Sequence, residues 1–315
     1  MFSIIVPVYL NAETLPALIE RLDAIAAELQ PAPLETVFVV DGSPDDSWQI
    51  LKQRLPAARF QAQLIAHSRN FGSFAAIRTG LAAANGDHFA VMAADLQEPP
   101  ELAKTFFTLL RDDTCDVAVG VRNSRSDGFV SDLASRLFWA LYRRLVQPEM
   151  PAGGIDVFGC SRKVRDALLA LTETNSTLVG LLVWAGFRRQ SVPYDRLPRP
   201  AGRSAWSLRR KIRYMEDSFY AFSDLPLRIL TLGGGLGIAA TIALSVVIVL
   251  ARLLGEISVP GYAPTVLIVM FFGALNLLCL GLIGGYVWRS FENSKQRPHA
   301  LTLAHERFQG PSEKA

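Results

Sequence analysis

The stretch VMAADLQEPP, residues 91–100, decides the fold and points to a site. An apolar run from residue 88 leads into it, and two consecutive prolines at its end begin a helical pattern. We therefore expect a buried strand, a polar turn and a helix. Ligands of open α/β sheets bind at the carboxyl ends of strands, which is where Asp95 and Gln97 fall. Their carboxylate and amide oxygens suit Mg²⁺ or Mn²⁺ bound beside substrate phosphates, although an ordinary strand end before a helix would give the same pattern.

Strand and helix patterns alternate on both sides of this stretch. Such alternation predicts an α/β domain with a mostly parallel, Rossmann-like sheet and helices on both faces. Right-handed crossovers place the ends of the first four strands, at Tyr9, Asp41, Ser68 and Asp95, along one edge. The predicted strands are residues 3–9, 36–40, 63–66, 88–92 and 116–121, and the predicted helices are residues 12–30, 47–55, 73–84 and 100–110.

Polar groups suited to a nucleotide follow two more of these strands. Asp41-Gly42-Ser43 supplies a carboxylate and a tight turn. The segment SRNFG, residues 68–72, supplies a cation, an amide and a flexible glycine before a helix N-terminus, which favours anions. Turn chemistry alone explains either motif. Their recurrence at successive strand ends predicts a single binding edge.

Composition indicates an apolar surface outside this domain. Only 19% of the 315 residues are charged, and the net charge is +3. The cysteines, Cys115, Cys160 and Cys279, show no paired spacing, so we expect neither a disulfide framework nor a zinc site. No basic region precedes the apolar run at the N-terminus, which predicts a strand and not a signal peptide.

Two uncharged apolar runs, residues 229–251 and 257–288, lie near the C-terminus. Each exceeds the roughly 20 residues that cross a bilayer core. We expect a transmembrane hairpin with helices at residues 227–254 and 262–289; two buried core helices are the alternative. Residues 1–200 then form the cytoplasmic catalytic domain.

Basic residues flank the hairpin on one side. Arg252 stands almost alone in the short connecting loop, set against Glu256. The positive-inside rule therefore puts both termini in the cytosol, as in a multi-pass protein of the cytoplasmic (inner) membrane. Residues 201–226 mix aromatic and basic side chains and could lie flat on the membrane surface or form a solvated helix. We expect the polar tail, residues 290–315, to be loose. The basic flanks are Arg209, Arg210, Lys211, Arg213 and Arg228 before the first run, and Arg289, Lys295 and Arg297 after the second.

With these motifs in place, the chain resembles family-2 glycosyltransferases of GT-A fold. More narrowly, it resembles polyprenyl-phosphate glycosyltransferases, the dolichol-phosphate-mannose synthase-like group and its bacterial undecaprenyl-phosphate relatives. The two-span hairpin in the same order completes the resemblance, which covers nearly the whole chain. The matching segments are IVPVY (5–9), VDGS (40–43), SRNFG (68–72), ADLQEPP (94–100), VGVR (119–122), VG and WAGF within 179–187, and GRSAW (202–206).

The resemblance implies an inverting transferase that moves a sugar from a nucleotide sugar, UDP-linked, to undecaprenyl or another polyprenyl phosphate in cell-envelope glycan or lipopolysaccharide modification. Asp95 and Arg122 would be catalytic, and Asp95 with Gln97 would bind Mg²⁺ or Mn²⁺. Arg122 and Ser135 would meet the lipid phosphate. Membrane lipids and further copies of the chain would be partners, and we expect no nucleic acid. The residues implied in substrate binding are Pro7, Tyr9, Asp41, Ser43, Arg69, Asn70, Ala94, Arg125 and Ser135.

Three positions depart from the family pattern. Ala93 replaces the first Asp of Asp-x-Asp, Val40 stands where Asp is common, and Ala205 stands where Lys follows Ser. Losing a carboxylate should weaken metal binding.

A lipid monophosphate is largely a dianion at neutral pH, so its oxygen needs no general base to attack the sugar. This fits the chain, where His67 and His88 are expected to be isolated strand-end residues. A catalytically weak lipid-carrier or nucleotide-binding scaffold remains an alternative. A polysaccharide-building transferase with a sugar hydroxyl acceptor would need a base, for which Glu173 and Asp156 are the candidates. Spans without charge argue against a channel or flippase.

Overall fold

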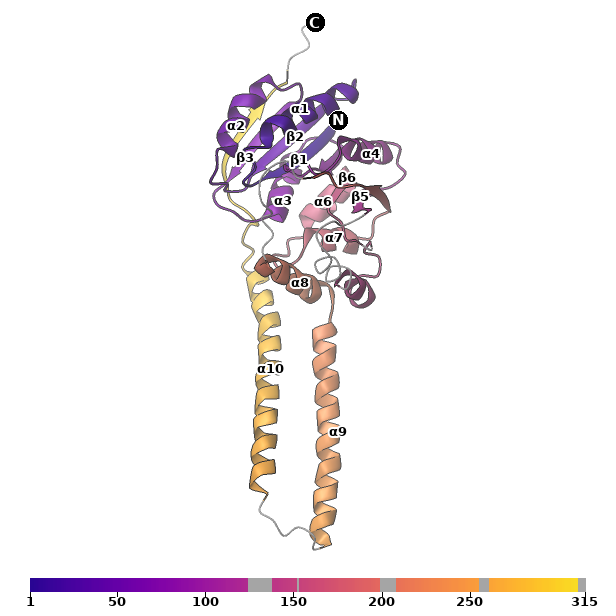
Figure 1. The fold of residues 1–315 in the computed structure, drawn as a ribbon, viewed down its shortest axis with the longest axis vertical. Coiled ribbons are helices and arrows are strands. Elements are labelled where there is room, and N and C mark those ends of the chain that lie inside the picture. Colours follow the sequence, from indigo (N-terminus) through magenta and orange to yellow (C-terminus); the bar gives the residue numbers. More distant parts are fainter. Residues whose placement is uncertain (124–137, 152, 199–207, 255–260, 311–315) are drawn as a thin grey trace.

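The protein's structure, a computed structural model, describes residues 1–123, 138–151, 153–198, 208–254 and 261–310. Within these residues, one mixed sheet has the strand order β7-β5-β6-β4-β1-β2-β3-β8 (Figure 1). The strands are β1 (Phe2–Val8), β2 (Leu34–Val40), β3 (Gln61–His67), β4 (His88–Val91), β5 (Val117–Arg122), β6 (Val157–Ser161), β7 (Arg189–Tyr194) and β8 (Thr302–Phe308). The helices are α1 (Leu15–Glu28), α2 (Ser47–Arg54), the short η1 (Leu55–Ala57), α3 (Ser73–Ala83), α4 (Pro100–Arg111), α6 (Arg162–Ala170), α7 (Leu178–Trp184), α8 (Leu208–Phe222), α9 (Leu225–Leu253) and α10 (Tyr262–Ser294).

The first four strands form the parallel half of the sheet. β1 pairs in parallel with β2 and with β4, and β2 pairs in parallel with β3. Their ends, at Val8, Val40, His67 and Val91, therefore share one edge, which we call the carboxyl edge. This confirms the α/β architecture and the common edge predicted from the alternation of strands and helices.

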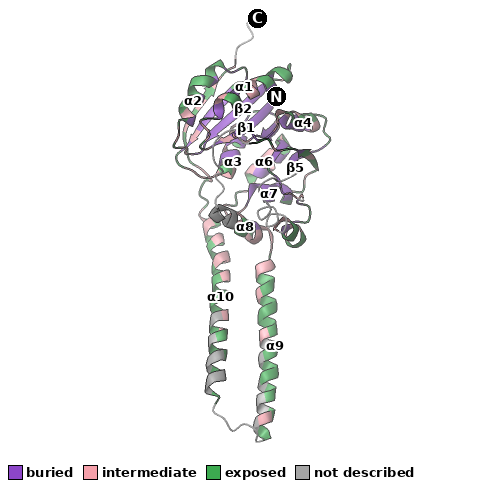
Figure 2. Cartoon of the chain, in the orientation of Figure 1, coloured by how far each residue is buried: buried purple, intermediate pink, exposed green. Residues whose placement is uncertain are grey.

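Helices cover both faces of this sheet. Ile4 and Ile5 are neighbours on β1 but belong to different buried clusters, so the two clusters lie on opposite faces. α1, α2 and α4 pack into one cluster, and α3, α6 and α7 pack into the other. Figure 2 shows the central strands as buried between these layers. The core thereby fixes the position of every strand end at the carboxyl edge.

The second half of the sheet was only partly predicted. β6 runs antiparallel to both β4 and β5, so β5 has the direction of β4. β7 pairs in parallel with β5. The carboxyl edge consequently also receives the ends of β5 and β7, at Arg122 and Tyr194. β5 matches a predicted strand, whereas β6 and β7 were not among the predicted strands.

Two long apolar helices extend away from the sheet. Among the described residues, the windows Leu225–Leu244 of α9 and Phe271–Ser294 of α10 are long and apolar enough to cross a membrane, judged by length and composition. Figure 2 shows both helices as largely exposed. Their bounds lie close to the predicted ones, although α10 continues beyond residue 289. α8 lies across the domain end of the two helices (Figure 1).

The expectation of a loose C-terminal tail is wrong for residues 302–308. These residues form β8, which pairs antiparallel with β3 at the edge of the sheet. Lys52 Nζ lies 2.6 Å from Glu306 Oε1, and the Ser68 amide donates to the Leu301 carbonyl at 2.9 Å. Exposed β3 backbone groups would otherwise lack partners, which is the physical reason that the tail is ordered here.

Candidate functional site at the carboxyl edge

The turn that carries Asp95 and Gln97 is held from several sides. The Thr14 hydroxyl donates to the Ala94 carbonyl at 2.7 Å, and Arg21 donates to the Glu98 carbonyl at 2.9 Å. Leu96 has φ 61°, a left-handed conformation that is costly for a branched residue. Strain of this kind concentrates at functional sites, where the surroundings hold it. Ala94, predicted to contact substrate, is buried and contributes its carbonyl to this support.

Asp95 and Gln97 converge on a cation that sequence reasoning missed. The Arg196 guanidinium donates to Gln97 Oε1, and its Nη2 lies 3.9 Å from Asp95 Oδ2. The Gln97 backbone N–H donates to Asp95 Oδ1 at 3.3 Å. Arg196 follows β7, so only the pairing of β7 with β5 brings it to this edge. The two predicted metal-binding oxygens thus face the same point, as a shared cation site requires.

Glu98 adds a second carboxyl group to the turn. Its side chain is buried, and Oε2 accepts the Ala93 N–H at 3.2 Å. Burial, together with the nearby charge of Asp95, raises the pKa of Glu98 to about 7. In the sequence, the only signal for a role of Glu98 in the site was that it follows Gln97. A glutamate just before a helix that begins with proline is equally typical of an ordinary helix start.

These side chains fit a metal ion only in company with other ligands. Among the described residues, no group of three or more His, Cys, Asp or Glu side chains is arranged to hold a metal. Asp95 supplies one carboxylate, and Gln97 supplies one amide oxygen. Mg²⁺ commonly binds through one or two carboxylates plus substrate phosphates, so this set suits a cation that binds together with a diphosphate.

Asp41 organises the neighbouring loop. Its Oδ1 accepts the Phe71 N–H at 2.9 Å, and its Oδ2 accepts the Gly72 N–H at 2.7 Å. Oδ1 also lies 2.8 Å from His67 Nδ1, and His67 Nε2 lies 2.9 Å from Thr79 Oγ1. His67 is therefore not isolated, contrary to the sequence analysis, and Asp41 is almost completely buried. In the structure, Asp41 holds residues 68–72 against the end of β2.

Gly42 allows two turns to touch. It has φ 58°, and a Cβ built on it would lie 2.3 Å from the Arg69 carbonyl carbon. Any side chain would therefore strike backbone. Ser43 Oγ accepts the Leu10 N–H at 2.8 Å and donates to Asp45 Oδ1 at 2.6 Å. The predicted binding turns are consequently tied into one rigid rim.

The remaining predicted residues of this rim lie nearer solvent. Pro7 is half-buried near the end of β1, and the Tyr9 N–H donates to Asn11 Oδ1 at 3.1 Å. Arg69 is exposed, with its guanidinium carbon 4.1 Å from the centre of the Phe71 ring. Asn70 is half-buried and accepts from Arg69 through its carbonyl at 3.3 Å. These groups leave cationic and polar atoms at the surface of the carboxyl edge.

Arg122 ends β5 in a compact ion pair. Its Nε lies 2.5 Å from Asp156 Oδ2, and its Nη2 donates to Asp156 Oδ1 at 2.8 Å. The Tyr194 hydroxyl donates to Asp156 Oδ2 at 3.2 Å. Asp156, one of the two candidate bases, is thus engaged with a cation. Glu173, the other, is exposed and not part of this group. Arg125 and Ser135 lie outside the described residues.

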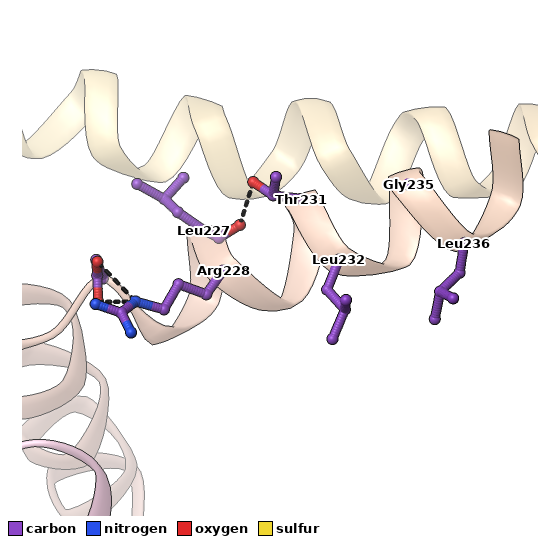
Figure 3. A pocket seen from close by; sticks show the side chains of 7 residues that line it. Leu227, Arg228, Thr231, Leu232, Gly235 and Leu236 are labelled. Carbon is purple, nitrogen blue, oxygen red and sulfur yellow. Dashed lines mark hydrogen bonds and ion pairs between the residues drawn. The ribbon is translucent and has the colours of Figure 1, made fainter. Parts of the chain in front are cut away.

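A separate hollow of about 620 Å³ lies along the start of α9. Figure 3 shows Leu232 and Leu236 pointing to the same side of that helix. Arg228 and Asp224, which also line it, form an ion pair at 2.8 Å. None of the predicted site residues lines this hollow, so the chemistry is to be sought at the carboxyl edge.

Comparisons with known proteins agree with this arrangement. The model of the glycosyl transferase family 2 matches residues 3–170. The Bacillus subtilis (strain 168) protein CsbB, named a glycosyltransferase, is 34% identical over 96% of this chain and 91% of its own length. The undecaprenyl-phosphate 4-deoxy-4-formamido-L-arabinose transferase of Yersinia enterocolitica is 31% identical over 94% of this chain and 90% of its own length.

A solved structure shows the same fold at low sequence identity. Mannosyl-3-phosphoglycerate synthase from Rubrobacter xylanophilus superposes with a TM-score of 0.50 at 16% identity, covering 74% of this chain and 75% of that chain. The GT-A fold expected from the sequence is confirmed. The chain belongs to glycosyl transferase family 2 and is a glycosyltransferase with a GT-A fold.

Proposed function

We propose that this glycosyltransferase moves a sugar from a nucleotide sugar, UDP-linked, to undecaprenyl or another polyprenyl phosphate at the cytoplasmic face of the inner membrane. Relatives named as undecaprenyl-phosphate sugar transferases align over 94% of the chain. The observation that carries the proposal is that the acidic turn at Asp95, the cation Arg122 and the return of the chain from α10 all meet the carboxyl edge.

The link between hairpin and site is short. α10 ends at Ser294 and β8 begins at Thr302, where it pairs with His67 at the carboxyl edge. Fully extended, such a link spans at most about 28 Å. β8 therefore begins at the carboxyl edge within this distance of the end of α10, which supports access of that edge to a lipid headgroup.

The proposed roles follow the positions of the side chains. Asp95 and Gln97 would hold Mg²⁺ or Mn²⁺, which when bound would neutralise charge on the diphosphate leaving group. Arg122 would contact the acceptor phosphate, with Arg125 and Ser135 as its proposed companions. Among the remaining candidates, Asp41 and Ala94 are buried and would hold the rim and the acidic turn in place. The other candidates would contact the base and ribose; these are Pro7, Tyr9, Ser43, Arg69 and Asn70.

The reaction is a single displacement. An oxygen of the acceptor phosphate dianion attacks the anomeric carbon, the bond from that carbon to the nucleoside diphosphate breaks, and the configuration inverts. No proton has to be removed from the nucleophile. Asp156, paired with Arg122, would orient that guanidinium instead of acting as a base. Most of the acceleration would come from positioning and preorganised charge.

We also propose the arrangement in the membrane. Residues 1–200 would form the cytosolic domain and residues 201–226 a surface segment. Helices at 227–254 and 262–289 would span the bilayer, and residues 290–315 would return to the cytosol. The exposed apolar faces of α9 and α10 would contact lipid and further copies of the chain. A phosphatase reporter fused after residue 256 should be active and one fused at the C-terminus inactive; the reverse pattern would contradict this topology.

Transfer itself is tested with purified full-length protein, radiolabelled nucleotide sugars, undecaprenyl phosphate and Mn²⁺ or Mg²⁺. Wild type should label the lipid, and Asp95→Asn should lose at least 100-fold in rate. Asp112→Asn, an exposed aspartate paired with Arg111, is the matched control and should keep full activity. No transfer from a broad donor panel would count against the proposal and favour the alternative of a nucleotide-binding scaffold.

A further inference from the structure

Arg196 is held at the proposed cation site by more than its charge. The Leu197 N–H donates to the Gln97 carbonyl at 2.9 Å, and Gln97 Nε2 donates to the Leu197 carbonyl at 3.2 Å. The Gln97 side chain therefore uses its nitrogen on Leu197 and its oxygen on Arg196. This two-sided contact fixes the backbone after β7 so that the guanidinium is directed to Gln97 and Asp95.

The Arg196 guanidinium and a metal ion would compete for the same two oxygens. Gln97 Oε1 accepts directly from Arg196, and Asp95 Oδ2 lies 3.9 Å from Nη2. A divalent cation bound to both oxygens would place like charges within a few ångströms of each other, which is unfavourable in a partly buried setting. The Asp95 side chain is 14% exposed, and the Arg196 side chain is 28% exposed, so solvent screens the pair only in part.

The alanine at position 93 favours Arg196 in this competition, because it supplies no ligand to a metal ion. An aspartate at position 93 would supply a second carboxylate, and more ligand charge raises affinity for a divalent cation. With Ala93, the turn brings one carboxylate, that of Asp95, to within 3.9 Å of the Arg196 guanidinium. A metal ion gains the missing anionic ligands only when a diphosphate arrives with it.

We propose that Arg196 is an internal cation that competes with a divalent metal ion for Asp95 and Gln97, and that metal and donor diphosphate together displace it. The inference rests on the proposed function for the identity of the diphosphate ligand. It assigns Arg196 as a positioning residue: it keeps the turn at Asp95 neutralised before the donor binds.

The test is a titration of the full-length, detergent-purified protein with Mn²⁺ alone, followed by the electron paramagnetic resonance signal of free Mn²⁺. Arg196→Gln should bind Mn²⁺ at least tenfold more tightly than wild type. Arg188→Gln is the matched control. Arg188 directly precedes β7, at the opposite end of the strand from Arg196, and pairs with Asp113 and Asp116. This variant should bind as wild type does. Asp95→Asn added to Arg196→Gln should abolish the gain.

Equal or weaker Mn²⁺ binding by Arg196→Gln would overturn the proposal, as would a gain that survives Asp95→Asn. Arg196→Ala provides a second variant, and unchanged melting temperatures would show that each protein is folded. In the transfer assay, Arg196→Gln should need less Mn²⁺ for half-maximal rate. Because the titration contains neither donor nor lipid, it can fail while transfer succeeds, and the reverse, so the two proposals are separable.

Discussion

At the residue scale, the acidic turn combines two carboxyl groups with opposite tendencies. Asp95 faces Arg196. Glu98 is buried beside Asp95 and forms no ion pair with a cation among the described residues. Burial and the charge of Asp95 raise the pKa of Glu98 from 4.5 to about 7. Glu98 is therefore only partly ionised at neutral pH, and its share of the negative charge of the turn falls as pH falls below 7.

This pKa predicts how stability depends on pH. Between pH 4.5 and 7 the unfolded chain loses the Glu98 proton while the folded protein keeps it, so stability falls as pH rises through this window. The loss should approach about 3 kcal/mol above pH 7. Glu98→Gln removes this contribution, so the melting temperature of wild type should drop relative to that variant between pH 5 and 7.5. Glu101→Gln, an exposed change three residues on, should track wild type; a constant gap for Glu98→Gln would refute the prediction.

Arg122 gives a second prediction at this scale. A charge-assisted hydrogen bond contributes about 1.5–3 kcal/mol, so Arg122→Gln should raise the KM for polyprenyl phosphate at least tenfold. The KM for the nucleotide sugar should stay within about twofold, because Arg122 is assigned to the acceptor. Steady-state kinetics with each substrate varied in turn measure both values. An effect confined to the donor would show that Arg122 has been assigned to the wrong substrate.

At the scale of elements, the rim of the site depends on one close approach. Gly42 combines φ 58° with a backbone atom 2.3 Å from a would-be Cβ, whereas Gly186 combines φ 71° with no atom nearer than 3.9 Å. Gly42→Ala should therefore cost more stability than Gly186→Ala, which carries the left-handed strain alone at about 1–3 kcal/mol. Melting temperatures of the two variants compare them directly. Equal losses would mean that residues 68–72 move away without cost.

β8 supplies the other prediction at this scale. A chain ending at residue 297 lacks β8 and leaves the β3 edge without its partner, so it should melt at a lower temperature and aggregate more readily. A chain ending at residue 310 keeps β8 and should behave as the full-length protein does. Unchanged melting of the shorter chain would show that β8 contributes nothing to the stability of the sheet.

The elements that could be predicted from the sequence are those with a regular period. Strands of the parallel half follow from apolar runs between helical patterns, and Asp95 and Gln97 follow from their place after β4. β6 and β7 were missed because the regular alternation ends after β5: β6 runs antiparallel to its neighbours, and two helices separate it from β7. Arg196 could not be placed, since its contact with Gln97 spans 99 residues and exists only after β7 pairs with β5. For β8, Pro298 and Pro311 were the available signal, because prolines commonly flank edge strands.

At the scale of the whole molecule, the hairpin is tied to the catalytic domain at its base. Arg289 on α10 lies 2.9 Å from Asp217 on α8 and 4.7 Å from the centre of the Tyr220 ring. The Thr174 hydroxyl donates to Asn293 Oδ1 at 2.6 Å. α10 is therefore held to α8 by Arg289, and the chain after α10 is held to the sheet by the pairing of β8 with β3. These contacts fix the direction in which the carboxyl edge faces relative to the proposed membrane helices.

In the proposed reaction, the phosphate oxygen of a polyprenyl phosphate attacks the anomeric carbon of a nucleotide sugar at this edge. The direct measurement uses a donor labelled with ¹⁸O between the sugar and the diphosphate, followed by mass spectrometry of both products. Attack by the phosphate oxygen predicts a lipid with a single phosphate and no label, with all of the ¹⁸O in the released nucleoside diphosphate. A lipid diphosphate-sugar that retains the label, with release of a nucleoside monophosphate, would contradict it.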